Sequence, residues 1–233
     1  MSFLLLVLVA KTGDAQDMKD LFTKVSKNYL TVDPFSADVD VYLFKDKNDT
    51  KGSLLGTGML RKSGRNYYSK FSDDELICNE NCTVILDHYY KRVSYFDEPK
   101  TLPKRNDYNF PNIDTLLKLN DSVVYNGMEE GYKVYSFYAH ENPVVCTRIS
   151  IDTTSFFVRK IVYYYSEGND RESYDAYKII ILYKNLSSKK ISNNVFSTKP
   201  YVVLKKGKPK LTSAYKSYKL TVAQNEKDEK KSF

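Results

Sequence analysis

Few residues in this sequence have the types and spacing that chemistry requires. The 233 residues include two histidines, His88 and His140, and neither has a metal-ligand partner at a recognised spacing. Both are therefore expected to be surface histidines in a turn or at a strand end. No HExxH, GxSxG or phosphate-binding glycine-rich pattern occurs. The sequence predicts no enzyme activity, no metal and no cofactor.

Three acids stand together at Asp73, Asp74 and Glu75, inside a predicted hairpin turn. Consecutive side chains diverge in such a turn, so these carboxylates are poorly placed to cooperate as a general acid and base. We predict that all three are solubilising turn residues.

Cys78 and Cys82 flank a three-residue turn at 79–81. A CxxxC pair without two further ligands is a poor zinc site, whereas a tight turn places the two Cβ atoms on facing strands. The spacing therefore predicts a Cys78–Cys82 disulfide, with Cys146 free and buried. Three buried thiols are the alternative.

The stretch 56–96 has the pattern of short strands joined by tight turns. Turn-forming residues at 62–64, 72–74, 79–81 and 88–91 interrupt runs of β-branched, aromatic and aliphatic residues. With 21 Tyr and 12 Phe but only 9 Gly and 7 Pro, the composition suits pleated strands with aromatic faces. An up-and-down antiparallel sheet in a mainly β chain is predicted.

Residues 3–10, FLLLVLVA, form the one continuous apolar run. It is much shorter than the roughly 20 residues that a spanning helix needs, so it is interpreted as the core of a signal peptide. Small residues at Gly13 and Ala15 predict cleavage after Ala15, and no cysteine follows that could be acylated. We expect an exported, soluble mature protein; a buried N-terminal strand is the alternative.

Helical spacing of apolar residues predicts an amphipathic helix over 17–30, capped by Asp17. Alternation then predicts strands over 35–44 and 54–62, and Gly56 and Gly58 would allow strong curvature in the second strand. Three prolines make 97–112 a crossing loop, and a short helix is expected over 113–119.

Four more strands are predicted at 132–139, 144–152, 156–166 and 174–183, with a charged turn at 167–172. Residues 201–233 form an extension in which 201–204 and 215–222 could add strands around a basic turn at 205–210. A charged, disordered tail is expected over 224–233. N-glycosylation triplets begin at Asn48, Asn81, Asn120 and Asn185, and only eukaryotic secretion would make them sites.

The order of elements in 56–96 resembles the early sheet of the LolA-type lipoprotein carriers. It comprises a strand, a basic–glycine turn, the Tyr67–Tyr68 strand, and a hairpin that ends in an Asp87-turn-Lys91-x-Val93 strand. Residues 191–200, ISNNVFSTKP, are similar to the family's ending, an Asn-x-x-Phe element followed by Pro. The resemblance covers about 17–200, which makes 16–200 a LolA-like domain after a signal peptide at 1–15.

This resemblance implies a half-open barrel of about ten strands, with the two helices packed against its concave side. A closed lipocalin-type barrel is the competing architecture. The implied function is that of a periplasmic, monomeric carrier for lipoproteins or lipid-like ligands, with partner proteins at the inner and outer membranes. An envelope sensor or protein-interaction domain of the same fold is the alternative, and an enzyme is disfavoured.

Acyl chains are expected between the concave face and the two helices, because the site must be apolar. The predicted lining residues are Val39, Val41, Leu43, Val93, Tyr95, Leu116, Leu117, Ile149 and Ile151. In the family a basic residue after the second strand holds the lid and governs transfer. Arg65 is the nearest candidate here, although Gly64 stands where Arg or Lys and Pro are usual.

A formal net charge of +7 is compatible with phosphate-bearing partners. The basic residues are scattered among the tyrosines, so a solvated basic surface is the simpler interpretation. Together with the predicted export signal, this argues against nucleic acid as a partner.

Overall fold

The computed structural model describes residues 12–97, 113–139, 143–166 and 176–223. Within these ranges two α-helices and two 3₁₀ helices accompany fourteen strands. The helices are α1 (Thr12–Thr31), α2 (Ile113–Leu119), η3 (Asn193–Phe196) and η4 (Ser213–Tyr215). The strands are β1 (Phe35–Phe44), β2 (Ser53–Ser63), β3 (Asn66–Phe71), β4 (Asp74–Cys78), β5 (Cys82–Asp87), β6 (Arg92–Asp97), β7 (Ser122–Glu129), β8 (Tyr132–Tyr138), β9 (Val144–Ile151), β10 (Val158–Tyr165), β11 (Lys178–Ser187), β12 (Val202–Lys205), β13 (Lys208–Leu211) and β14 (Lys219–Ala223).

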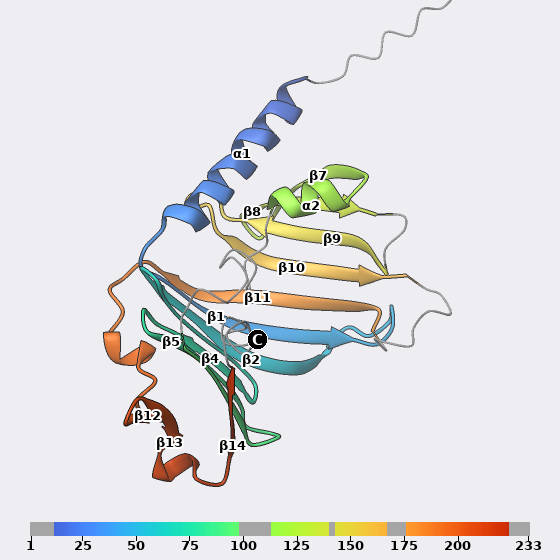
Figure 1. The fold of residues 1–233 in the computed structure, drawn as a ribbon. Coiled ribbons are helices and arrows are strands. Elements are labelled where there is room, and N and C mark those ends of the chain that lie inside the picture. The colour runs from blue at the N-terminus through green and yellow to red at the C-terminus, as the bar shows by residue number, and fades with distance from the viewer. Residues whose placement is uncertain (1–11, 98–112, 140–142, 167–175, 224–233) are drawn as a thin grey trace, which may run out of the picture.

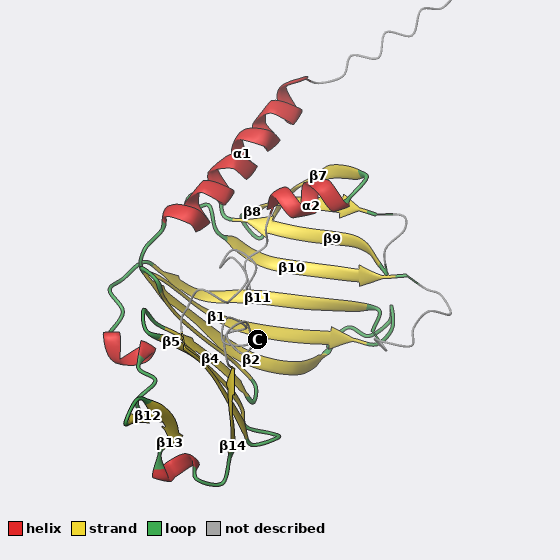
Figure 2. Cartoon of the chain, viewed as in Figure 1, coloured by secondary structure: helices red, strands yellow, loops and turns green. Residues whose placement is uncertain are grey.

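Twelve of these strands form one open sheet in the order β14-β6-β5-β4-β3-β2-β1-β11-β10-β9-β8-β7 (Figure 1). Two antiparallel meanders, β1–β6 and β7–β11, meet where β1 pairs with β11. The sheet curves strongly without closing, and α1 and α2 lie at its β7–β10 end (Figure 2). The predicted mainly β, half-open, LolA-like barrel is therefore confirmed.

The strand count differs from the prediction at two places. Strand β7 was not predicted, because Asn126–Gly127 is a turn signal within it; the structure uses this dipeptide for a shift of register between Tyr125 and Gly127. The predicted basic turn at 205–210 is mostly strand, since β12 and β13 pair through Lys205 and Lys208 and only two residues turn.

Several boundaries also move. Helix α1 begins at Thr12, so the predicted cleavage position lies within it. Strand β10 starts two residues late because Phe156 has a positive φ of 54°. The predicted core of the signal peptide, the loop at 98–112, His140, the turn at 167–172 and the tail at 224–233 lie outside the described residues.

The ladder defines two faces of the sheet. The inner, concave face includes Val39, Leu60 and Tyr183, and packs against α1 in one hydrophobic core. The outer face includes Ile77 and Val84, and forms a second core with residues that follow η3. The two cores therefore lie on opposite sides of the same sheet.

Strands β2 and β3 approach each other closely beside Gly56 and Gly58. A Cβ atom on Gly58 would lie 2.4 Å from the carbonyl oxygen of Lys70, and one on Gly56 would lie 2.9 Å from the Phe71 ring. Because real Cβ atoms do not approach a backbone atom this closely, a side chain at Gly58 would force β2 and β3 apart, whereas one at Gly56 would meet only side-chain atoms. The predicted role of Gly56 and Gly58 in the curvature of the sheet stays a prediction.

Gly58→Ala is expected to lower the free energy of unfolding by about 1–3 kcal/mol, because the added methyl group forces the β3 backbone to move. Urea unfolding followed by circular dichroism measures the effect. Thr57→Ala, at the exposed neighbouring position, is the control. Equal unfolding midpoints for the two variants would contradict the steric argument.

Candidate functional site

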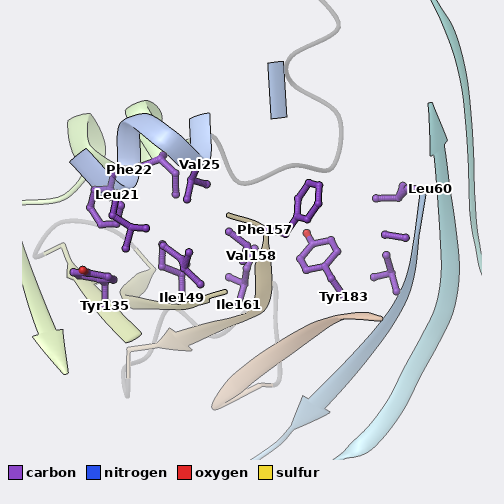
Figure 3. Packing of buried hydrophobic residues seen from close by; sticks show 14 of the residues in the cluster. Leu21, Phe22, Val25, Leu60, Tyr135, Ile149, Phe157, Val158, Ile161 and Tyr183 are labelled. Atoms are coloured by element: carbon purple, nitrogen blue, oxygen red, sulfur yellow. The ribbon is translucent and has the colours of Figure 1, made fainter. Parts of the chain in front are cut away.

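Helix α1 covers one end of the inner face through Leu21, Phe22 and Val25 (Figure 3). The Phe22 ring lies edge-on to Tyr135, with ring centroids 4.9 Å apart, and stacks on Phe137 at 5.6 Å. Val25 is fully buried. These aromatic and aliphatic contacts make the helix part of the core at this end.

Two polar contacts fix the last turns of α1 to the β9–β10 turn. The Asn28 side chain donates to the carbonyl oxygen of Ser155 at 2.9 Å. The Tyr29 hydroxyl accepts the Val158 N–H at 3.0 Å. Burial raises the pKa of Tyr29, so the phenol stays neutral. The helix is thereby held at a defined angle over the inner face.

Asp152 organises the turn to which α1 is attached. Its Oδ1 accepts the N–H groups of Thr154 and Ser155, and its Oδ2 accepts Arg159 Nη2 at 2.7 Å. Burial alone would raise the pKa of Asp152, but the Arg159 and backbone hydrogen bonds outweigh it and lower the pKa to about 2.

An apolar row continues across the inner face beyond α1. Tyr163 pairs with Ile179, which also pairs with Leu43, and Ile181 lies two residues further along β11. These four side chains are half-buried, whereas Val41 and Ile161, one step nearer the helix, are buried. We call Tyr163, Ile179, Ile181 and Leu43 the apolar row.

Hydroxyl groups supply much of the polar character beside this row. Burial raises the pKa values of Tyr163 and Tyr183, so both phenols remain uncharged. Lys62, opposite Phe35, is a charged residue on the inner face of β2, and it lies at the strand end. A neutral, largely apolar surface results in the middle of the face.

Helix α2 covers the inner face with only part of its surface. Ile113 is buried and Leu116 packs against the core, but Leu117 is 40% exposed. Leu117 therefore belongs to the outer side of the helix, contrary to the prediction that it lines the cavity.

The predicted lining residues separate into three groups. Val39, Val41, Ile149 and Ile151 lie on the inner face and are buried in its core, and Leu43 is in the apolar row. Val93 and Tyr95 lie on the outer face, in the second core, so their assignment to the concave side is wrong. Alternation gave two equivalent faces for β6, and nothing local in the sequence distinguishes them.

Arg65, the predicted transfer residue, is exposed in the β2–β3 turn. The neighbouring Gly64 N–H donates to the Asp33 carboxylate at 2.8 Å, which ties this turn to the connection between α1 and β1. Arg61 lies on the outer face, where its guanidinium donates to Asp38 Oδ1 at 2.8 Å.

The predicted Cys78–Cys82 disulfide is wrong: Cys78, Cys82 and Cys146 are all present as thiols. Cys78 pairs with Thr83 across the β4–β5 ladder and accepts its hydroxyl at 3.3 Å, so Cys82, one residue earlier, points to the other face. A three-residue turn did not imply facing Cβ atoms, because the register is offset by one. Cys146 is half-buried rather than buried.

Glu75 and His88 also differ from their predictions. Asp73 is an exposed turn residue as expected, and Asp74 is exposed but begins β4, whereas Glu75 is only 7% exposed, on the outer face. His88 is half-buried, and its Nε2 lies 3.0 Å from Glu75 Oε1. The sequence signal that could have located Glu75 is alternation within DELIC, which puts Glu75 on the face of Ile77.

The described residues include no group of three or more His, Cys, Asp or Glu that could hold a metal ion. Among the same residues, no helix is both long and apolar enough to cross a membrane.

An open, strongly curved antiparallel sheet with helices on its concave side defines a LolA-like half-barrel. No family model matches the chain, and no curated protein matches it. In structure it is similar to an uncharacterized conserved protein from Thermus thermophilus, with a TM-score of 0.50 and 8% identity, over 89% of this chain and 100% of that one. This likeness supports the fold.

Two further solved structures are similar at lower scores. One is a LolA superfamily protein from Nitrosomonas europaea, with a TM-score of 0.34, 9% identity, and coverage of 78% of this chain and 97% of that one. The other is a chain of the Pseudomonas aeruginosa MucA/MucB complex, with a TM-score of 0.41, 8% identity, and coverage of 78% and 61%. Scores this low support no argument about function.

Asp152→Asn tests how the α1 attachment depends on pH. A carboxyl group with a lowered pKa stabilises the fold above its unfolded pKa, and this contribution is lost as pH falls from about 4 toward 2. The free energy of unfolding of the wild type should exceed that of the variant by about 1 kcal/mol at pH 6, with solvent screening taken into account. This difference should shrink toward pH 2. Urea unfolding across this pH range measures it.

Asp46→Asn is the control, since Asp46 accepts turn N–H groups on the exposed β1–β2 connection. If the wild-type advantage over Asp152→Asn were independent of pH, the ion pair with Arg159 would not be its source.

Proposed function

We propose that this protein is an exported, periplasmic, non-catalytic carrier that binds acyl chains of lipids or lipoproteins on its inner face. The observation that supports the proposal most directly is the apolar row. Its four side chains stay half-buried on a concave surface, whereas Val39, Val41 and Ile161 on the same face are buried in the core that α1 helps to form. Partly exposed, contiguous apolar surface in a concavity is what an acyl chain requires.

The geometry suits a chain-like ligand better than a compact polar one. Tyr163, Ile179 and Leu43 are direct cross-strand neighbours, so the row runs across three adjacent strands. Each methylene group that leaves water on such a surface contributes about 0.8 kcal/mol. The proposal keeps Val39, Val41, Ile149 and Ile151 as the floor of the site and Leu116 as its contact on α2.

Export, the signal peptide at 1–15, the transfer role of Arg65 and partner proteins at the two membranes are parts of the same proposal. Export and the signal peptide rest on the apolar run at 3–10 and on the small residues Gly13 and Ala15, whereas the transfer role and the partner proteins rest on the sequence resemblance. Arg65 is accessible in its turn, as contact with a delivering or receiving protein would require.

Leu43→Glu and Leu116→Glu should each weaken binding of a fluorescent fatty-acid probe by about tenfold or more, because a carboxylate would be buried beside the acyl chain. Fluorescence titration measures the affinity, and circular dichroism checks that the β-sheet persists. Leu54→Glu is the matched control, because Leu54 is exposed on β2 and its variant should bind the probe normally.

Undiminished probe binding by folded Leu43→Glu and Leu116→Glu variants would overturn the carrier proposal. The alternative, a sensor or interaction domain of the same fold, would then be favoured.

A further inference from the structure

Residues 193–223 form a separate unit on the outer face, which we call the C-terminal cap. It comprises η3, β12, β13, η4 and β14, and lies at the end of the sheet opposite α1 (Figure 1). Strand β14 pairs with β6 in parallel through five residue pairs, from Lys219 with Arg92 to Ala223 with Phe96. The cap therefore covers both an edge of the sheet and part of one face.

Apolar contacts hold this cap only lightly. Within 193–223, Phe196 and Val202 are the buried hydrophobic residues, and the residues that pack only partly buried against the second core are Tyr201, Leu211, Tyr215, Tyr218 and Leu220. Strand β14 is exposed except at Leu220, which is half-buried. A segment with so few buried apolar side chains has a low free energy of local opening unless polar contacts add to it.

Several of those polar contacts converge on one carboxylate. Glu75 Oε2 accepts the hydroxyl of Tyr201 at 3.0 Å, at the start of β12. Glu75 Oε1 hydrogen-bonds His88 Nε2, and His88 Nδ1 lies 2.9 Å from the hydroxyl of Tyr218, just before β14. Glu75 is thus linked to two separate parts of the cap.

The sheet side supplies two more donors to the same group. The hydroxyl of Tyr68 donates to Oε2 at 3.1 Å and Lys70 Nζ to Oε1 at 3.2 Å. Burial raises the pKa of Glu75, but the hydrogen bonds from His88, Tyr201 and Lys70 outweigh it and hold the pKa below its usual value. The carboxylate is ionised at neutral pH, and charge-assisted hydrogen bonds are the stronger kind.

Tyrosine rings complete the connection. Tyr215 lies edge-on to both Tyr201 and Tyr218, at centroid distances of 5.1 and 5.0 Å. The two cap tyrosines that are linked to Glu75 are therefore joined through a third ring, so that loss of one contact disturbs the other.

We propose that the C-terminal cap can detach as one unit and that the hydrogen bonds to Glu75 hold it on the outer face. Without the Glu75 contacts, β14 leaves the β6 edge and the cap lifts from the outer face while the inner core stays folded. Opening frees the N–H and C=O groups of β6 and exposes Cys82, whose Sγ lies 3.6 Å from Thr198 Oγ1 under the cap.

Hydrogen exchange with mass spectrometry tests this in full-length Glu75→Gln at pH 7. Amides of β6 and of 201–223 should exchange about tenfold faster than in wild type, as expected for loss of charge-assisted hydrogen bonds to a buried group. Amides of β8, β9 and β10 should be unchanged. Glu80→Gln, at an exposed turn position, is the matched control and should behave as wild type.

Thiol labelling gives an independent measurement. Cys82 should react faster with 4,4′-dithiodipyridine in Glu75→Gln, whereas Cys78, buried on the inner face, should not. Equal exchange in the Glu75 and Glu80 variants would overturn the proposal. Equally faster amide exchange in β8–β10 would also overturn it, because Glu75 would then stabilise the whole fold and not the cap in particular.

Tyr201→Phe and Tyr218→Phe keep the proposal testable if Glu75→Gln does not fold. Each removes one hydroxyl and retains the ring, and each should speed amide exchange in the cap by a smaller factor than Glu75→Gln does. Tyr215→Phe is their control, because its ring packs in the same cluster. Indistinguishable amide exchange in all three variants would count against the proposal that the hydrogen bonds to Glu75 hold the cap.

Discussion

The close approach of β2 to β3 at Gly58 is the constraint on which the rest of the structure depends. The Lys70 carbonyl oxygen and the Phe71 ring occupy the space where a Cβ atom of residue 58 would lie, so only a residue without a side chain fits between them. The curvature of the sheet turns Leu60 toward Tyr183, and both then share the inner core with α1. A flatter sheet would separate the two meanders' inner faces, and one helix could not contact residues from both.

The two faces of the sheet are covered in different ways because the sheet bends. The inner face is concave, and α1 and α2 pack against part of it, while the apolar row is left half-buried. The outer face is convex, so it needs a cover that spreads over it, and the C-terminal cap provides one. Glu75 illustrates the consequence: a residue beside an exposed turn becomes buried because a segment more than a hundred residues later lies over it.

Much of the architecture could be predicted from sequence, because it is encoded locally. Turn residues placed the hairpins of β2–β6, and periodicity placed α1, α2 and β8–β11, whereas β7 was missed. The errors arose where long-range packing decides. The side of the sheet on which Val93 and Tyr95 lie depends on register and on which face the cap covers, and the offset of Cys78 from Cys82 depends on the same ladder. No local pattern records either fact.

The pairing of β1 with β11 has a consequence for how the chain folds. Asp40 and Lys184, an ion pair across this seam, are 144 positions apart. Each meander consists of neighbouring hairpins, which close short loops and form quickly, whereas the seam must wait until β11 exists. During synthesis β1 therefore presents an unpaired edge until most of the chain has been made. The alternating acids of β1, Asp38 and Asp40, line that edge on the outer face, and such charges discourage pairing with a wrong strand in the interval.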